Sequence, residues 1–158
     1  MRIPCLRHII AALFVLTIAC PAGADETMWT AKGQRLYVPA YSHVYQGAKG
    51  RPYQLAIMLS IRNVDEANPI TITTIKYYDD HGALVKDHLT EPMVIAPMAT
   101  REVYIRERDS SGGSGANFIV SWESPKEVHV PVVQTVMIGT ASTQGISFVC
   151  DGVILEEK

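Results

Sequence analysis

The stretch Leu55-Ala56-Ile57-Met58-Leu59-Ser60-Ile61-Arg62 decides the fold class of this chain. Its large aliphatic residues occupy every second position, and smaller or polar residues stand between most of them. Successive side chains of a strand point to opposite faces, so this period of two predicts a strand with one face buried in a core. No segment after residue 25 has apolar residues spaced three and four apart over three turns, as a surface helix requires.

The same alternation recurs along the chain and predicts the other strands. Ile70-Thr71-Ile72 and Ile75-Lys76-Tyr77 alternate in opposite phases, which indicates a β-bulge near Thr73-Thr74. Asp79-Asp80-His81-Gly82 then predicts a turn with glycine at positive φ, and a return strand begins at Leu84. Further strands are expected at 93–95, 103–105, 118–122, 135–138, 146–150 and 153–155. About eight or nine short strands separated by turns predict one all-β domain, an immunoglobulin-like antiparallel β-sandwich.

The first residues have the layout of a secretory signal. A basic start is followed by an apolar run at 9–19 and by Ala22-Gly23-Ala24, and the run is shorter than the roughly 20 residues that span a bilayer. We expect cleavage after Ala24, an extended polar segment at 25–35, and a single domain at 36–158. This predicts a periplasmic or secreted protein. The alternative is a lipid anchor at Cys20, which ends a loose lipobox.

Charge and cysteine content narrow the partners. Removal of residues 1–24 takes away Arg2 and Arg7, so 12 of the 14 basic residues remain beside 16 acidic ones. A mildly acidic chain has no electrostatic reason to bind nucleic acid or an anionic membrane, which leaves a protein or a small molecule as partner. Cys150 alone remains after cleavage, so no internal disulfide is possible, and we expect it to be a small buried residue.

The segment 106–117 contains the most unusual composition in the chain. It lacks the lysine and the following helix of a phosphate-binding P-loop. Gly112-Gly113-Ser114-Gly115-Ala116 resembles a nucleophile elbow, but a strand follows where that device needs a helix, so a hydrolase using Ser114 is only an alternative. Glycine-rich loops also expose N–H groups that bind anions, and neighbouring arginines add positive charge. The candidate contact residues are Arg106, Arg108, Asp109, Ser110, Ser111, Gly112, Gly113, Ser114, Gly115 and Asn117. The competing interpretation is a structural connection in which glycine provides shape and serine and asparagine bond the backbone.

A second candidate patch consists of Tyr37, Tyr41, His43 and Tyr45. Tyrosine is favoured at recognition surfaces because one end of its side chain is apolar and the other is polar. The same residues are also explained if they cover an edge of the sandwich. Both interpretations stay open on the sequence.

No metal or cofactor is expected. No histidine or cysteine pair has the spacing of a metal site. His88 with Met93 and Met98 has the composition of a soft copper site, although the two methionines are better explained as filling gaps in the core. Asn63, Asp65 and Asn68 lack the spacing of a calcium loop and are interpreted as a solvated turn. A periplasmic metal-handling protein remains an alternative function.

Five stretches together resemble a known family: residues 36–45, 59–63, 75–79, 111–120 and 136–140. They are similar to the DUF3124 family, a group of bacterial exported or lipid-anchored proteins without assigned function. The resemblance covers about residues 35–155 and implies a single periplasmic or membrane-tethered domain, but it brings no catalytic or binding residue. We therefore expect an exported binding or interaction module of the cell envelope rather than an enzyme.

Overall fold

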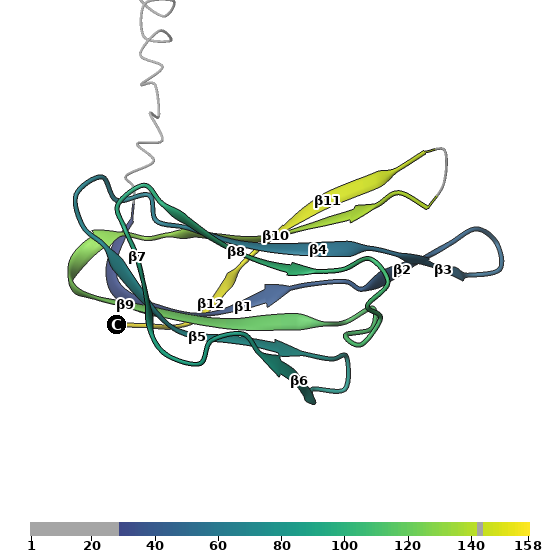
Figure 1. Cartoon of the computed structure of the whole chain (residues 1–158), viewed down its shortest axis with the longest axis horizontal. Coiled ribbons are helices and arrows are strands. Elements are labelled where there is room, and N and C mark those ends of the chain that lie inside the picture. The colour runs from purple at the N-terminus through teal and green to yellow at the C-terminus, as the bar shows by residue number, and fades with distance from the viewer. Residues whose placement is uncertain (1–28, 142–143) are drawn as a thin grey trace, which may run out of the picture.

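The computed structural model describes residues 29–141 and 144–158 (Figure 1). The expected signal sequence and the lipobox ending at Cys20 lie outside these residues. Within the described part there is no helix long and apolar enough to cross a membrane.

A six-stranded antiparallel sheet forms one layer of the molecule. Its strands run in the order β12-β1-β9-β5-β6, and β7 also pairs with β5. The bounds are β1 (Thr30–Pro39), β5 (Ile70–Tyr78), β6 (Leu84–Asp87), β7 (Met93–Ile95), β9 (Asn117–His129) and β12 (Val153–Glu157). The first strand therefore begins inside the segment 25–35 that was expected only to be extended, and β1 lies between two partners in this sheet.

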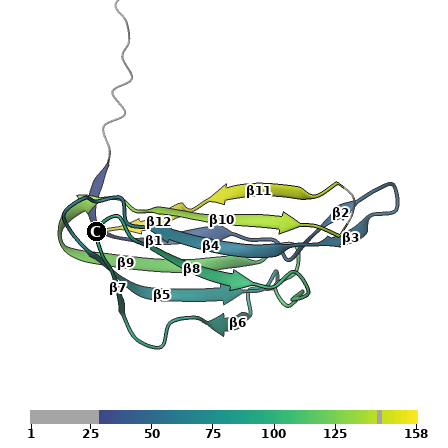
Figure 2. The same ribbon diagram turned by 45° about the horizontal axis from the view of Figure 1, so that its top comes forward.

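A four-stranded antiparallel sheet forms the other layer, in the order β11-β10-β4-β8. Its strands are β4 (Ala56–Arg62), β8 (Thr100–Ile105), β10 (Val132–Gly139) and β11 (Ile146–Asp151), and a separate hairpin joins β2 (His43–Gln46) to β3 (Arg51–Gln54). Figures 1 and 2 show the two sheets stacked, with the β2–β3 hairpin projecting at one end. The all-β sandwich is confirmed, but the described residues form twelve strands rather than eight or nine.

The core lies between the inner faces of the two sheets. Leu59 of β4 and Val120 of β9 are fully buried, and so are the other inward positions of the pattern on these two strands and on β5, with at most 2% exposed. The largest buried side chain is Trp122, whose indole N–H donates a hydrogen bond of 3.3 Å to the side-chain oxygen of Gln34. Alternation works as a predictor here because a sandwich buries one face of each strand.

Local features of β5 follow the sequence closely. The register between β5 and β9 shifts between Ile72 and Thr74, which confirms the predicted bulge. Gly82 has a φ of +80° in the turn that leads to β6, as expected.

On β4, in contrast, Ser60 was assigned to the solvent face but is buried, and the guanidinium of Arg62 donates a hydrogen bond of 3.1 Å to its hydroxyl.

Two expectations about sulfur-containing side chains are wrong. Met98 does not fill a gap in the core: it is 65% exposed and adopts a positive φ of +57°. Cys150 is only partly buried, because β11 is an edge strand and contacts the core from one side. Its pKa is nevertheless raised, first by burial and then by the charge of Asp151.

Candidate functional site

A pocket of about 370 Å³ lies between the edge strands of the two sheets. The six-stranded sheet supplies Tyr77 from β5 and Lys86 from β6, with His88 directly after that strand. The four-stranded sheet supplies Tyr104 and Ile105 from β8, and the loop after β8 adds Arg106 and Asp109. We call this cavity the β6–β8 pocket. Its volume lies within the range of small-molecule sites in proteins.

Two unpaired cations line the β6–β8 pocket. Lys86 and Arg106 come from opposite sheets, and neither forms an ion pair with any described residue. The third charge, Asp109, is held by its neighbour: its Oδ1 accepts a hydrogen bond of 3.0 Å from the Ser111 backbone N–H and one of 2.6 Å from the Ser111 hydroxyl. These two bonds, with a smaller contribution from the charge of Lys86, lower the pKa of Asp109, while partial burial opposes them. The formal charge of the lining is therefore +1 when His88 is neutral.

His88 lines the pocket and also carries a buried polar atom. Its Nε2 is buried and has no hydrogen-bond partner among the described residues. Burial is the main cause that lowers its pKa; Lys86 acts in the same direction and Asp87 opposes both. The imidazole is thus neutral near pH 7, and its ring lies beside those of Tyr77 (centroids 6.5 Å apart) and Phe118 (6.1 Å).

Tyr77 is a buried residue of the pocket lining, and neighbouring residues hold both its ring and its hydroxyl in place. Its ring packs on Phe118 with centroids 4.7 Å apart, and its hydroxyl shares a hydrogen bond of 3.0 Å with the hydroxyl of Ser42, a fully buried residue. Burial raises the pKa of Tyr77, and the bond to Ser42 partly offsets that rise. The phenol is therefore neutral and held in place rather than free to ionise.

The glycine-rich half of the candidate loop packs closely against neighbouring side chains. A Cβ on Gly112 would collide with the Tyr77 hydroxyl, and one on Gly113, whose φ is +74°, would collide with the Asp80 carboxylate. The loop is also bonded through its backbone to the sandwich, since the Asp80 N–H donates to the Gly112 carbonyl (3.1 Å) and the Ser42 N–H to the Gly113 carbonyl (2.9 Å). Glycine is required here because neighbouring atoms occupy the space of a side chain.

The other predicted loop residues lie apart from the β6–β8 pocket. Arg108 and Ser110 are exposed, and neither lines the pocket. Ser114 is half-buried, and none of the hydrogen bonds among the described residues involves its side chain. Asn117 is the first residue of β9 and pairs with Tyr78 and Pro39. Of the ten candidates, only Arg106 and Asp109 line the pocket directly.

The residues of the tyrosine patch lie on several elements of the fold. Tyr37 lies on β1, the Tyr41 ring packs edge-on against Phe148 of β11 with centroids 5.6 Å apart, and Tyr45 stands on the hairpin beside His43 at 5.1 Å. The Nδ1 of His43 is buried without a described hydrogen-bond partner. These residues connect the projecting hairpin and β11 to the sandwich, and none of them lines the β6–β8 pocket.

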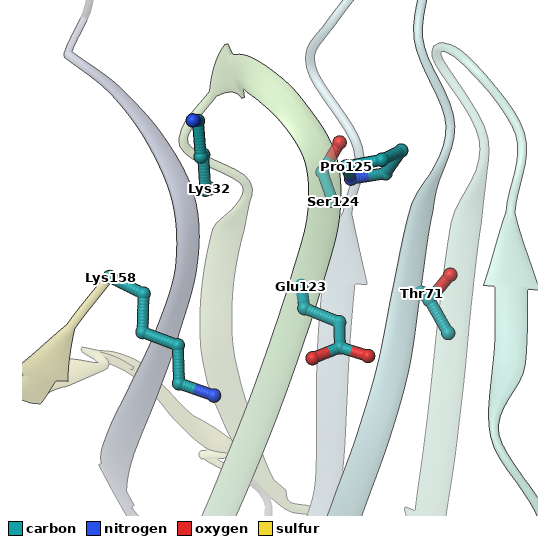
Figure 3. Close-up of a pocket in the computed structure, with 6 residues that line it drawn as sticks. All are labelled: Lys32, Thr71, Glu123, Ser124, Pro125 and Lys158. Carbon is teal, nitrogen blue, oxygen red and sulfur yellow. The ribbon is translucent and has the colours of Figure 1, made fainter.

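A second hollow of about 400 Å³ lies over β1, β5 and β9 (Figure 3). Lys32 and Lys158 border one side of it, Thr71 the other, and the Glu123 carboxylate stands between them. Both lysines and Glu123 are exposed. The ionisable side chains of this hollow sum to a formal charge of +1, as in the β6–β8 pocket, but none of its lining residues has a buried polar side-chain atom without a partner among the described residues.

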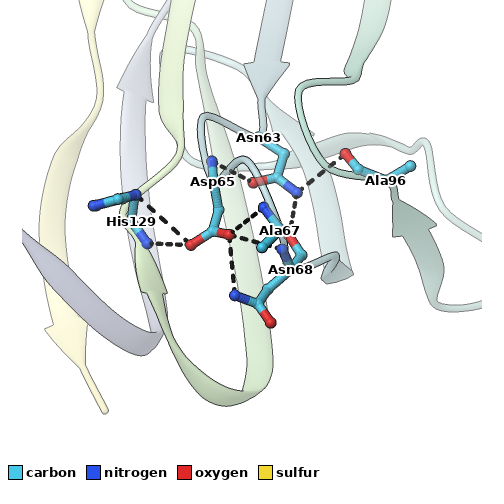
Figure 4. A network of polar contacts seen from close by, with 6 residues as sticks. All are labelled: Asn63, Asp65, Ala67, Asn68, Ala96 and His129. Atoms are coloured by element: carbon cyan, nitrogen blue, oxygen red, sulfur yellow. Dashed lines mark hydrogen bonds and ion pairs between the residues drawn. The ribbon is translucent and has the colours of Figure 1, made fainter.

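The turn around Asp65 is a buried hydrogen-bond network, so its interpretation as a solvated turn is wrong (Figure 4). The Asp65 carboxylate accepts backbone N–H bonds from Ala67 (2.9 Å), Asn68 (2.7 Å) and His129 (3.1 Å). These bonds lower the pKa of Asp65 to about 2. The bond from Ala67 has the largest effect, followed by those from Asn68 and His129, while burial raises the pKa. Both carboxylate oxygens of Asp65 accept hydrogen bonds from the protein, and the bond from His129 ties the turn to the end of β9.

One group of potential metal ligands occurs among the described residues, formed by Asp79, Asp80 and His81. The turn itself accounts for it: the Asp79 Oδ1 accepts backbone N–H bonds from His81 (2.9 Å) and Ala83 (2.7 Å). The Nδ1 atom of His81 lies 2.7 Å from the Oδ1 atom of Asp80, and the His81 side chain is 86% exposed. The geometry is that of a solvent-facing turn.

Sequence reasoning missed the residues that complete the pocket. Lys86, Tyr77 and Tyr104 carry no motif, and His88 was considered only together with methionines. The only signal was the return strand after Gly82, which predicts that Lys86 and His88 run beside Tyr77. Nothing in the linear pattern indicated that β8 of the other sheet lies opposite.

Comparisons with known proteins identify a family but no activity. Residues 33–155 match the family described as "Protein of unknown function (DUF3124)". No curated protein matches the chain. A Thermotoga maritima protein, 1070, is 13% identical and has a TM-score of 0.48, with 79% of this chain and 97% of its own covered. FLGD from P. aeruginosa is also 13% identical, with a TM-score of 0.22 over 80% of this chain and 76% of its own. Neither similarity is high enough to carry an argument about function.

Proposed function

Since the chain belongs to the DUF3124 family, whose function is unknown, we propose that it is a non-catalytic binding module of the cell envelope. Its ligand or partner is held at the β6–β8 pocket by Lys86, Arg106 and their neighbours. The observation that carries the proposal is this combination of a cavity, two unpaired cations and a buried His88 nitrogen without a partner.

Export is proposed from the sequence of the first residues. The basic start, the apolar run and Ala22-Gly23-Ala24 support cleavage by a signal peptidase and release into the periplasm or the medium. Lipidation at Cys20 is the alternative. Mass spectrometry of the N-terminus of the cell-made protein distinguishes the two: a free amine at Asp25 supports the first, and an acylated Cys20 supports the second.

Binding is supported over catalysis by the surroundings of Ser114. A serine nucleophile needs a base within hydrogen-bond reach, and no hydrogen bond of the described residues joins Ser114 to a histidine. The segment after it enters strand β9 rather than a helix. A fluorophosphonate probe that labels the protein but not a Ser114→Ala variant would establish the hydrolase instead. Elemental analysis that finds about one metal ion per chain would favour the metal-handling alternative.

Site-directed photo-cross-linking in the native cell tests the proposal. A photoreactive phenylalanine replaces Tyr104, which lines the pocket and is 64% exposed, or Leu155 on β12, which is 51% exposed and does not line it. We expect a discrete adduct, protein or small molecule, from position 104 and none from position 155. The adduct should disappear in a Lys86→Glu background. Equal adducts from both positions, or an adduct insensitive to Lys86→Glu, would refute the location of the site.

A further inference from the structure

We propose that the β6–β8 pocket binds a small organic anion, with a carboxylate or phosphate group between Lys86 and Arg106 and beside His88. This inference rests on the proposed function and names the ligand class of the same site.

The sign of the local charge opposes that of the whole chain. The full sequence has a formal net charge of −2, yet the lining contains two cations and one anion. The anion, Asp109, is already bonded twice by Ser111, whereas Lys86 and Arg106 have no ion-pair partner among the described residues. Two cations from opposite sides of a cavity, unpaired by the protein, are complementary to an anionic group of a ligand.

The position of the two cations is set by the fold rather than by flexible termini. Lys86 belongs to β6, which is hydrogen-bonded to β5 through Lys76↔Asp87 and Tyr77↔Lys86. Arg106 directly follows β8, whose Ile105 is paired with Ile57 of β4. An anion that bridges the two side chains therefore joins the open edges of the two sheets, where no described strand ladder does so.

His88 supplies an atom that the protein leaves unsatisfied. Buried polar atoms in native proteins nearly always have a partner, so a buried nitrogen without a partner in the protein calls for an explanation. The Nε2 of His88 is such an atom, and its residue lines the same cavity as the two cations.

The remaining lining favours an organic ligand over a bare inorganic ion. Tyr104 is 64% exposed and offers an aromatic ring beside the charges, whereas Tyr77 and Ile105 are buried and contribute little accessible surface. A cavity of about 370 Å³ also exceeds the space that one phosphate ion fills. Small-molecule sites commonly combine such apolar lining with a few polar groups that fix orientation.

Nuclear magnetic resonance titration of the protein, as the cell processes it, tests the inference. The probes are succinate and glycerol 3-phosphate, with glycerol as the uncharged match and inorganic phosphate as the inorganic match. We expect the organic anions to shift the signals of the His88 ring and the backbone N–H groups of Lys86 and Arg106, with weaker effects of phosphate and none of glycerol.

Variants with matched charge changes locate the binding. Lys86→Gln and Arg106→Gln should each weaken the binding of the organic anion by about tenfold or more, as expected for one lost charge-assisted hydrogen bond. Lys32→Gln removes the same charge at the second hollow and should leave the affinity unchanged. Far-ultraviolet circular dichroism of each variant confirms that it is folded.

Three results would overturn the inference. They are no shifts with either organic anion up to about 10 mM, the weak limit of specific binding; equal loss of affinity in Lys32→Gln; or phosphate binding as tightly as the organic anions. A cross-link at position 104 that persists while all anions fail would overturn the ligand class and leave the binding module standing. If the anions bind but position 104 yields no adduct in cells, the pocket chemistry stands and the cellular role fails.

Discussion

Gly112→Ala is expected to destabilise the protein strongly, although alanine tolerates the backbone conformation at this position. An added Cβ would overlap the Tyr77 hydroxyl and lie 2.6 Å from the Tyr77 Cζ and 2.7 Å from the Ala116 Cβ. Overpacking of this kind costs roughly 1–3 kcal/mol, and displacement of Tyr77 also breaks its bond to the buried Ser42, worth about 1 kcal/mol. We therefore expect a loss of about 2–4 kcal/mol in the free energy of unfolding.

Urea denaturation followed by tryptophan fluorescence measures this loss, because Trp122 is 2% exposed in the native state and becomes solvated on unfolding. With a slope of roughly 2 kcal/mol per molar urea, the midpoint should fall by about 1–2 M. Gly115→Ala is the matched control: its Cβ would lie 3.1 Å from the Cβ of the exposed residue Asp80, and we expect less than about 1 kcal/mol.

A double-mutant cycle with Tyr77→Phe tests the cause. Phenylalanine lacks the hydroxyl that the new methyl group would overlap, so the cost of Gly112→Ala should be smaller by about 1 kcal/mol in this background. It should not vanish, because the ring carbon and Ala116 remain in place. If Gly112→Ala and Gly115→Ala differ by less than about 0.5 kcal/mol, or if the cycle shows no coupling, the glycine-rich segment is not packed as described.

Three further predictions concern groups outside the loop. Asp65 has a folded-state pKa of about 2, below its usual 3.8, so its contribution to stability is present above about pH 4 and is lost as the pH falls towards 2. The Asp65→Asn variant should therefore show a flatter dependence of the unfolding free energy on pH over this range, and an unchanged pH profile would contradict the assignment. Asn63→Ala should cost about 2–3 kcal/mol in thermal or urea unfolding, because the two N–H groups of its amide are shared among three backbone carbonyls, at 2.9, 3.2 and 3.1 Å. A loss below about 0.5 kcal/mol would show that those carbonyls find other partners. Cys150 has a raised pKa and is half-buried, so its alkylation near pH 8 should be slower in the folded protein than in urea, and equal rates would refute its protection.

The strands that alternate cleanly could be predicted because the physics is local. In β4 each second residue must face the core, so Ile57, Leu59 and Ile61 determine their own burial. The bulge in β5 could also be predicted from the sequence, because a change of phase within one strand requires an extra residue.

The polar network and the candidate pocket could not be predicted, because both depend on partners far away in the sequence. Asn63 and Asp65 look like turn residues, yet their bonds reach Ile95 and His129. Lys86 belongs to β6 of one sheet and Arg106 directly follows β8 of the other, and no period or spacing relates the two positions. Composition identifies a loop as unusual, whereas only the packing of the two sheets shows what that loop lies beside.

Tyr77 connects the two halves of the segment 106–117. On one side it packs on Gly112 and bonds Ser42, which holds the glycine-rich half against the end of the sandwich. On the other side it lines the β6–β8 pocket together with Arg106 and Asp109. A substitution at Gly112 therefore disturbs the pocket through Tyr77, and loss of binding in such a variant does not show that glycine contacts a ligand. A binding role of this segment is separated from its structural role only by substitutions such as Lys86→Gln. Such substitutions change the charge of the pocket lining and leave the packing of Tyr77 intact.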